Sequence, residues 1–345
     1  NKRQRMQSML KNNILDRLNR SFEYLRISVT DKCNFRCTYC MPEEKFGSGY
    51  KFLKKNDLLS YEEIIRLIKI FQNFGLKKVR LTGGEPLLRK NIDNLVRGIK
   101  SYTNINKISM TTNGSLLNES IASKLKASGL DSITISLDSL SKKTNSYLNT
   151  TNQDYRNVVN AIDLVIKIFG FVKINMVVIK NINDSDIIQM IDKFKNRNVQ
   201  LRFIEYMDVG ESNGWSIKNV ITSNEIRNII SSKYKINKLS DEINSTSERW
   251  KINAHKAELA FISSISKPFC TNCDRGRISA DGKFFTCLFS TNGHNLLKII
   301  RANSSDEKVL EFFQDIWEKR DDHYSEIRFN QKHLQNKIEM SYIGG

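Results

Sequence analysis

The spacing of apolar residues changes repeatedly along the chain between the period of a strand and the period of a helix. From residue 25 onward, short runs rich in Ile, Val and Leu are separated by loops and by segments with apolar residues three and four positions apart. One such helical face carries Ile64, Leu67 and Phe71. The predicted strands are 25–30, 78–83, 107–112, 132–138, 172–179 and 200–207.

Capping residues mark where the predicted helices begin and end. Ser60 and Glu63 have the spacing of a capping box, and Gly75 follows the same helix as a stop signal. Asn118 and Ser185 are the predicted N-caps of two later helices. The helices therefore fall between the predicted strands.

Six strands that alternate with helices favour a parallel sheet, because parallel neighbours need a crossover connection. Six units are too few for a complete eightfold barrel, so the predicted fold is α/β, a partial (β/α)6 barrel of the TIM type. The chemistry of such a fold belongs at the carboxyl ends of the strands. There the first three strands lead into a cysteine-rich loop, Gly-Gly-Glu-Pro at 83–86, and Asn113-Gly114.

Beyond residue 208 the alternation stops. Residues 208–250 are polar and rich in Asn and Ser around one predicted helix at 224–232, and a last helix is predicted near 306–319. Two β-like runs, 257–266 and 283–289, lie between these helices. The predicted parts are an N-terminal arm at 1–24, the barrel at 25–210 and a C-terminal α+β extension at 211–345.

The formal net charge of +18 favours a polyanionic partner only if the cations are gathered together. The lysines are scattered, and no stripe with stacking aromatics stands out, so no nucleic-acid partner is expected. A metal-stabilised nucleic-acid-binding protein is the rival from a non-enzyme class. No run of eighteen apolar residues and no secretory pattern occurs, so no membrane partner is expected.

All six cysteines fall into two triplets, which are Cys33, Cys37 and Cys40, and Cys270, Cys273 and Cys287. A disulfide framework belongs to small secreted chains, so two metal-binding triplets in a reducing compartment fit better. Three thiolates leave one iron of a four-iron cluster open to a small molecule. The alternatives are a zinc clip or free thiols at the first triplet, and a zinc ribbon completed by His294 at the second.

The first triplet lies in Cys-Asn-Phe-Arg-Cys-Thr-Tyr-Cys at 33–40, and Thr-Gly-Gly-Glu-Pro at 82–86 follows the second strand. Together these motifs resemble those of radical S-adenosylmethionine (radical SAM) enzymes, whose fold is a six-unit partial barrel. The resemblance implies that the first triplet holds a 4Fe–4S cluster whose open iron binds SAM. It implies a SAM site lined by Tyr39, Gly84, Ser136 and Met207.

Within that superfamily the chain resembles the GTP 3′,8-cyclases of molybdenum cofactor biosynthesis. The resemblance rests on the second cysteine spacing, Arg-Gly-Arg at 275–277, Phe-Ile-Glu-Tyr-Met-Asp at 203–208, and Gly344-Gly345 at the end. It implies a second 4Fe–4S cluster that binds the guanine of GTP, and a diglycine tail inserted into the active site. The implied GTP contacts are Arg26, Arg80, Thr111, Lys173, Arg275, Gly276 and Arg277.

The residues themselves support an anionic substrate. Arg26, Arg80 and Lys173 fall inside predicted strands, where an inward-pointing charge needs a partner such as a phosphate. Arg275 and Arg277 alternate, so they project to the same side of an extended segment. An outward-pointing or rim charge is the alternative for the strand cations.

By resemblance, a 5′-deoxyadenosyl radical removes the 3′ hydrogen of GTP, and the resulting C3′ radical bonds to C8. One further reduction then gives (8S)-3′,8-cyclo-7,8-dihydroguanosine 5′-triphosphate. The implied partners are a downstream cyclic pyranopterin monophosphate synthase and a reductant protein of the flavodoxin or ferredoxin type, with a homodimer left open. The expected location is the cytoplasm, with an organelle matrix as the alternative. The alternative function is another radical SAM enzyme with an auxiliary cluster, such as a peptide-modifying maturase.

Overall fold

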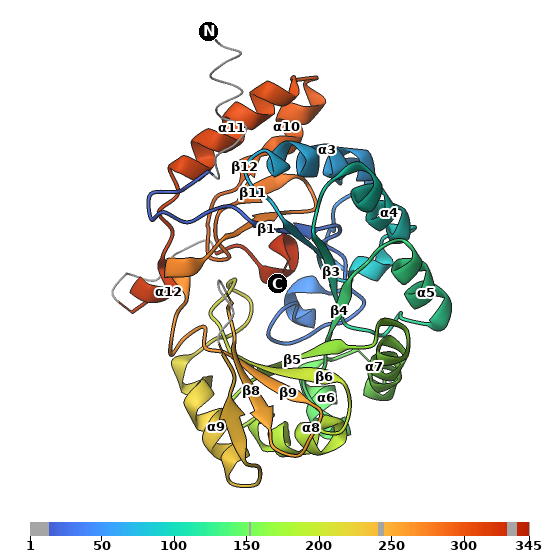
Figure 1. Cartoon of the computed structure of the whole chain (residues 1–345), viewed down its shortest axis with the longest axis vertical. Coiled ribbons are helices and arrows are strands. Elements are labelled where there is room, and N and C mark those ends of the chain that lie inside the picture. The colour runs from blue at the N-terminus through green and yellow to red at the C-terminus, as the bar shows by residue number, and fades with distance from the viewer. Residues whose placement is uncertain (1–13, 152, 241–244, 330–336, 345) are drawn as a thin grey trace.

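The computed structural model describes residues 14–151, 153–240, 245–329 and 337–344. Its strands form one sheet in the order β12-β11-β10-β1-β2-β3-β4-β5-β6-β9-β8-β7. The sheet curves around the middle of the molecule, helices cover its outside, and the C-terminal end of the chain lies near the centre of the view (Figure 1). The predicted α/β architecture is confirmed.

Each of the six predicted strands is present, and neighbouring strands run parallel. Their bounds are β1 (Tyr24–Ser28), β2 (Lys78–Thr82), β3 (Lys107–Thr112), β4 (Ser132–Ser136), β5 (Val172–Val178) and β6 (Val199–Glu205). Because every one of these strands ends at the same edge, the loops that follow them share one mouth.

The C-terminal part of the chain extends this sheet at both edges. At one edge, β10 (Arg275–Ile278) pairs in parallel with β1, and β11 (Lys283–Phe285) and β12 (His294–Asn295) follow in antiparallel order. At the other edge, β9 (Glu258–Ile262) pairs in parallel with β6, and β8 (Glu248–Ile252) and β7 (Ile236–Lys238) follow. The two cysteine triplets thereby come to neighbouring strands, since β1 and β10 are paired.

The helices occupy the positions between strands that the apolar spacing predicts, and several shorter turns join them. The longer helices are α3 (Tyr61–Gln72), α4 (Ile92–Tyr102), α5 (Glu119–Ala127), α6 (Lys142–Leu148), α7 (Tyr155–Phe169), α8 (Ile187–Phe194), α9 (Ser223–Ser231), α10 (Leu296–Arg301) and α11 (Asp306–Glu318). The short ones are α2 (Glu43–Phe46), α12 (Tyr324–Ile327), α13 (Met340–Ile343) and the 3₁₀ turns η1 (Lys55–Asp57), η2 (Pro86–Leu88), η3 (Asp184–Asp186), η4 (Ile217–Asn219) and η5 (Cys270–Asn272).

The predicted caps are confirmed in two cases and wrong in one. Ser60 and Glu63 form the reciprocal capping box at α3, and the Asn118 side chain accepts from the first turn of α5. Ser185 does not cap α8, because it is exposed within η3, and α8 begins at Ile187 without a side-chain cap. The Asn183 side chain accepts from the Ile179 amide and donates to the Val177 and Asp138 carbonyls, which anchors the residue before η3.

A cluster of buried aromatic rings joins the two ends of the chain. Phe22 lies 4.8 Å from Trp317 and 5.6 Å from Phe71, measured between ring centroids, and Phe284 and Phe313 complete the cluster. All five rings are fully or almost fully buried. Residues 14–23 are therefore anchored against α3, β11 and α11 rather than held by local contacts alone.

In the part of the chain that the structure describes, none of the helices combines the length and apolar character that crossing a membrane requires.

Candidate functional site

A cavity of about 310 Å³ is lined by residues at the carboxyl ends of the parallel strands and by residues at the amino end of β10. All six cysteines line it, so the two triplets face one space although they are far apart in the sequence. Most of the other predicted site residues also line it, namely Arg26, Tyr39, Arg80, Gly84, Thr111, Ser136, Met207, Arg275 and Arg277.

The first triplet lies on the loop after β1, and Arg36 inside the triplet fixes its shape. Arg36 Nη1 donates to the Cys33 carbonyl at 2.8 Å, and Arg36 Nε donates to the Phe46 carbonyl at 2.8 Å. The Cys40 amide donates to the Cys37 carbonyl at 3.0 Å, which folds the second half of the loop into a turn. Contacts close in sequence thus shape the loop, and its backbone also bonds residues 148–150.

Burial sets the charge of these thiols. It raises the pKa of Cys33 to about 11 and raises the pKa values of Cys37 and Cys40 as well. Three buried thiolates beside one another are unfavourable without cations, which iron would supply. The donor set therefore fits an iron–sulfur cluster with one iron left open.

The Gly-Gly-Glu-Pro loop packs directly against the first triplet. A Cβ on Gly84 would lie 2.2 Å from the Lys32 carbonyl oxygen, so only glycine lets the two loops approach this closely. Glu85 accepts hydrogen bonds from Thr112 Oγ1 and the Asn113 amide, both at 2.7 Å, and burial raises the pKa of Glu85 to about 7. This carboxyl group ties the loop after β2 to the loop after β3.

Tyr39 lines the cavity from the first triplet's loop, and Ser136 lines it from the end of β4. The Tyr39 hydroxyl donates to Asp138 Oδ2 at 2.6 Å, and Asp138 Oδ1 accepts from the Val177 amide at 2.9 Å. Met207 lies just beyond β6 and packs partly buried against Val209 and its aromatic neighbours. The side chains predicted to bind SAM therefore border the same cavity.

Strand register gathers arginines on the inner face of the sheet. Arg26 on β1 is directly paired with Arg80 on β2 and with Arg277 on β10. Arg275 lies one pleat below and points to the same side, as its alternation with Arg277 predicts. Arg202 enters the cavity from β6, so five guanidinium groups line it.

Two of these guanidinium groups have a buried nitrogen without a hydrogen-bond partner in the described part of the chain. Arg26 Nε and Arg202 Nε are inaccessible and donate no hydrogen bond there. Burial, together with Arg275 and Arg80, lowers the pKa of Arg26 to about 10. Buried donors that lack acceptors are costly, and an anionic ligand would satisfy them.

Sequence reasoning missed Arg202 and Tyr24. Arg202 met the criterion applied to Arg26 and Arg80, a cation inside a predicted strand, and could have been found by it. Tyr24 begins β1, and its hydroxyl accepts from Arg80 Nε while Arg80 Nη1 donates to Thr111 at 3.0 Å. Burial alone would raise the pKa of Tyr24, but the charges of Arg80 and Arg26 outweigh it and lower this pKa to about 7.

Two predicted GTP contacts do not line the cavity. Lys173 shares the inner face of β5 with Asn175, one pleat farther from the mouth, and only Asn175 reaches the cavity. Gly276 faces the other side of β10, where a Cβ would lie 2.7 Å from the Phe284 ring. The glycine between the two arginines therefore serves the packing of the aromatic cluster.

The second triplet is divided between two segments. Cys270 begins η5 and Cys273 follows this turn, whereas Cys287 lies just after β11. Burial opposes ionisation of Cys273, but Arg275 and Arg320 lower its pKa to about 7. His294, the alternative fourth ligand, is exposed on β12 and does not line the cavity.

In the described ranges, the cysteines of neither triplet are gathered around the position of a single metal ion. A four-iron cluster does not require this, because each cysteine binds a different iron. The six cysteines are free thiols. Their arrangement is compatible with two clusters.

The C-terminal residues lie at the carboxyl ends of β2 and β10. Arg277 donates to the Gly344 carbonyl, and the Tyr342 hydroxyl bonds Asp281 at 2.6 Å. Gly344 has φ +74°, and a Cβ there would lie 2.4 Å from Thr82 Cγ2, so both conformation and space require glycine. Gly345 lies outside the described residues.

Comparison with known proteins supports the same assignment. The Radical SAM superfamily matches residues 27–194, and the family described as Molybdenum Cofactor Synthesis C matches residues 199–326. Among solved structures, Streptococcus suis SuiB bound to precursor peptide SuiA covers 90% of this chain and 68% of its own, with a TM-score of 0.61. Its sequence identity of 18% limits that likeness to the fold.

Curated relatives cover nearly the whole chain. A Staphylococcus haemolyticus protein named GTP 3′,8-cyclase is 42% identical over 337 residues, which are 96% of this chain and 99% of the relative. A protein of the same name from Staphylococcus epidermidis is 42% identical over 343 residues, which are 97% and 100% of the two chains. The resemblance inferred from the two cysteine triplets is confirmed, and the chain belongs to the GTP 3′,8-cyclase family of radical SAM proteins.

Proposed function

We propose that this chain cyclises GTP to (8S)-3′,8-cyclo-7,8-dihydroguanosine 5′-triphosphate for molybdenum cofactor biosynthesis. The observation that carries the proposal is the single cavity that both cysteine triplets and five arginines line. The reaction needs a site for the radical donor, a site for the purine and a site for the triphosphate. The cavity offers one cysteine triplet for each of the first two and arginines for the third. The names of the relatives point to the same substrate.

The family implies two 4Fe–4S clusters and SAM, and the first cluster would supply the electron that releases the 5′-deoxyadenosyl radical from SAM. In our proposal Cys33, Cys37 and Cys40 hold the first cluster. Gly84 keeps the backbone close to it, while the SAM adenosyl and methionine groups lie against Tyr39, Ser136 and Met207. The hydrogen bond from Tyr39 to Asp138 fixes the ring in place before SAM arrives.

The triphosphate is assigned to the arginines on the inner face of the sheet. Arg26 and Arg202 have buried Nε atoms that need acceptors, and Arg80 is already oriented by Thr111 and Tyr24. Phosphate oxygens satisfy such donors through strong charge-assisted bonds. Lys173 and Gly276 are assigned weaker roles than predicted, since neither lines the cavity.

The guanine is assigned to the second triplet. Cys270, Cys273 and Cys287 hold the second cluster, and Arg275 and Arg277 project between it and the triphosphate region. Gly344 borders this region, because Arg277 bonds its carbonyl. We assign the tail a positioning role for Arg277 during GTP binding.

The proposal extends to partners and location. A cyclic pyranopterin monophosphate synthase takes the product, and a flavodoxin- or ferredoxin-type protein delivers electrons. The net charge of +18 suits encounter with an acidic reductant. Six free cysteines suit the cytoplasm, where thiols stay reduced.

The experiment is an anaerobic assay of 5′-deoxyadenosine release from SAM with reductant. The reconstituted protein holds about eight irons if both clusters are present. We expect release to be far faster with GTP than with ATP or without a nucleotide, because the second triplet and arginines select the guanine nucleotide. Equal release in all three reactions would reject GTP as the substrate, whatever the iron content.

A further inference from the structure

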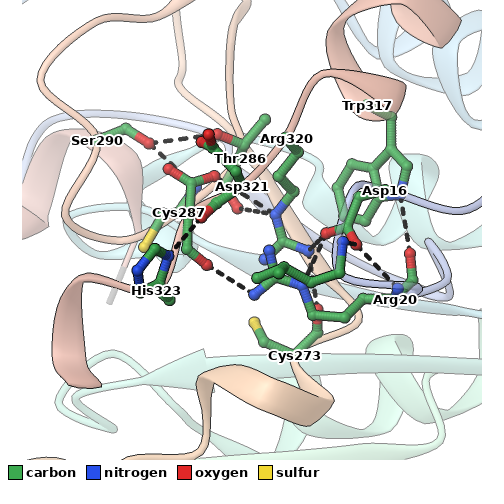
Figure 2. Close-up of polar contacts among 12 residues, drawn as sticks. Asp16, Arg20, Cys273, Thr286, Cys287, Ser290, Trp317, Arg320, Asp321 and His323 are labelled. Atoms are coloured by element: carbon green, nitrogen blue, oxygen red, sulfur yellow. Dashed lines mark hydrogen bonds and ion pairs between the residues drawn. The ribbon is translucent and has the colours of Figure 1, made fainter. Parts of the chain in front are cut away.

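A buried network of three charged side chains lies behind the second triplet. Asp16 Oδ2 is 2.7 Å from Arg20 Nε and 3.0 Å from Arg320 Nη1. The side chains of Asp16, Arg20 and Arg320 are 0%, 2% and 1% exposed. We call this group the Arg20–Asp16–Arg320 triad, and Figure 2 shows the carboxylate between the two guanidinium groups.

The triad bonds the backbone of every segment that carries a cysteine of the second triplet. Arg20 Nη1 donates to the Cys270 carbonyl at 2.9 Å. Arg320 Nη1 donates to the Cys273 carbonyl at 2.9 Å, and Arg320 Nε donates to the carbonyl of Thr286, the residue before Cys287, at 3.1 Å. Two arginines thereby link η5 to the end of β11 (Figure 2).

The triad is itself held from two directions. Asp16 Oδ1 accepts from the Leu18 and Arg20 amides, both at 2.9 Å, which folds residues 16–20 into a turn around the carboxylate. Trp317 Nε1 donates to the Arg20 carbonyl at 3.2 Å, and the Arg320 guanidinium lies 4.5 Å from the Trp317 ring centroid. Removing one member of a buried charge pair strongly destabilises a protein, because it leaves the other charge buried without its partner.

The second triplet needs such external support. Cys273 and Cys287 are separated by β10 and β11, so no single turn sets the spacing of the three sulfurs. Carbonyl bonds from one rigid group fix that spacing in the absence of a cluster.

We propose that the Arg20–Asp16–Arg320 triad is a positioning site for the second cluster. It presets the three cysteine segments and makes retention of this cluster, but not of the first, depend on residues 16–20 near the start of the chain. The inference goes beyond the proposed reaction but rests on the proposed second cluster.

The test measures iron in two backgrounds of the full-length chain. Replacing Cys33, Cys37 and Cys40 by Ala leaves only the second triplet, and replacing Cys270, Cys273 and Cys287 leaves only the first. Each parent should hold about four irons after anaerobic reconstitution. Arg320→Gln and Asp16→Asn should reduce iron to less than about one in the first background and leave about four in the second.

Arg301→Gln is the matched control. Arg301 also donates to two backbone carbonyls and pairs with a carboxylate, Glu63, but it lies on α10 away from the cysteines. It should leave iron unchanged in both backgrounds. Arg320→Lys keeps the charge but not the fork of donors, so it should retain more iron than Arg320→Gln.

Three outcomes would overturn the proposal. Full iron retention by Arg320→Gln and Asp16→Asn would show that the triad does not position the cysteines. Equal iron loss in both backgrounds, with loss of far-ultraviolet circular dichroism, would assign the triad to general folding. A parent with only the second triplet that binds no iron would overturn the proposed second cluster, and the triad's role with it.

Discussion

The two cysteine triplets are supported by arginines at very different distances along the chain. Arg36 lies within the first triplet and bonds the carbonyl of Cys33, three residues away. In the second triplet, Arg20 bonds Cys270 across 250 positions, and Arg320 bonds Cys273 across 47. The same interaction, a guanidinium on a cysteine carbonyl, is local in one case and joins both ends of the chain in the other.

This difference sets the order in which the two sites can be completed. The arginine bonds of the first triplet close a short loop, which costs little chain entropy, and the backbone of this loop also pairs with residues 148–150. The second triplet needs residues 16–20, β10, β11 and the segment after α11 in place together. Long-range contacts of this kind form late and fail first. We therefore expect the second site to be the more fragile one.

The largest expected effect comes from removing one ligand at each site. Cys37→Ala and Cys273→Ala should each lower iron from about eight to about four per chain. Cys37→Ala should abolish 5′-deoxyadenosine release, because SAM is assigned to the first triplet. Cys273→Ala should abolish cyclised product but keep slow release without GTP dependence.

Iron analysis and chromatography of both products measure this difference. If Cys273→Ala also abolished 5′-deoxyadenosine release, the two triplets would not have separate tasks, and the contrast between them would lose its chemical meaning. Cys287→Ala should behave as Cys273→Ala does, since both belong to the second triplet.

The next effect concerns the arginines between the triplets. Arg277→Ala removes a buried guanidinium that bonds Gly344, and it should raise the KM for GTP roughly 10- to 100-fold, the range of a charge-assisted hydrogen bond. Iron should stay at about eight, because Arg277 contacts no cysteine carbonyl. Steady-state kinetics measure the KM for GTP, and iron analysis shows whether both clusters are retained.

Arg249→Ala is the control for that variant. Arg249 also lies on a strand and pairs with Glu258 at 3.1 Å, but it does not line the cavity, so its loss should leave the KM unchanged. Iron loss in Arg277→Ala would show instead that the residue maintains the second site.

A smaller effect is expected from Arg36→Gln, which tests the local triplet directly. The loop keeps the Cys40 amide bond to Cys37 and the Arg36 amide bond to Asn149 at 2.9 Å. In chains that carry only the first triplet, Arg36→Gln should therefore lower the iron content by less than about half. In chains that carry only the second triplet, Arg320→Gln should remove nearly all of the iron. Iron content and visible absorbance measure both losses. Equal losses for Arg36→Gln and Arg320→Gln would show that the two triplets do not differ in their dependence on an arginine.

The same contrast explains how much of the molecule was predictable. The repeated strand and helix spacing predicted β1 to β6 because each pattern is local. It did not predict that β9 and β10 add parallel strands at both edges, since their partners lie far away in the sequence. Both triplets were found from spacing alone, but the triad behind the second was not, because Asp16 and Arg320 show no local pattern.

Side-chain direction was also only partly predictable. Alternation placed Arg275 and Arg277 on one side correctly, and the cations inside strands pointed to an anion site. Lys173 shows the limit of that reasoning, because facing inward does not fix the depth at which a side chain ends. Tyr24 shows another limit, since its importance comes from Arg80 on the neighbouring strand.

The smallest predicted effect lies where β1 meets β10, at Tyr24. Its folded pKa of about 7 is below the value of 10.0 in an unfolded chain, so the unfolded state binds more protons between these pH values. The contribution of Tyr24 to the free energy of unfolding therefore rises as the pH increases from 7 to 10, and it is lost as the pH falls through 7. Three pKa units correspond to roughly 4 kcal/mol as an upper bound.

Tyr24→Phe should remove that rise while keeping the ring. Denaturant unfolding of cluster-free protein at pH 7 and pH 10 should show a smaller difference in the variant, and phenolate absorbance should show one fewer tyrosine titrating near pH 7. Bound GTP should raise the pKa of Tyr24, because a triphosphate competes for Arg80 and Arg26. If GTP left the pKa of Tyr24 unchanged, the triphosphate would not bind Arg80 and Arg26. The paired strands β1 and β10 would then connect the two cysteine triplets without contacting the substrate.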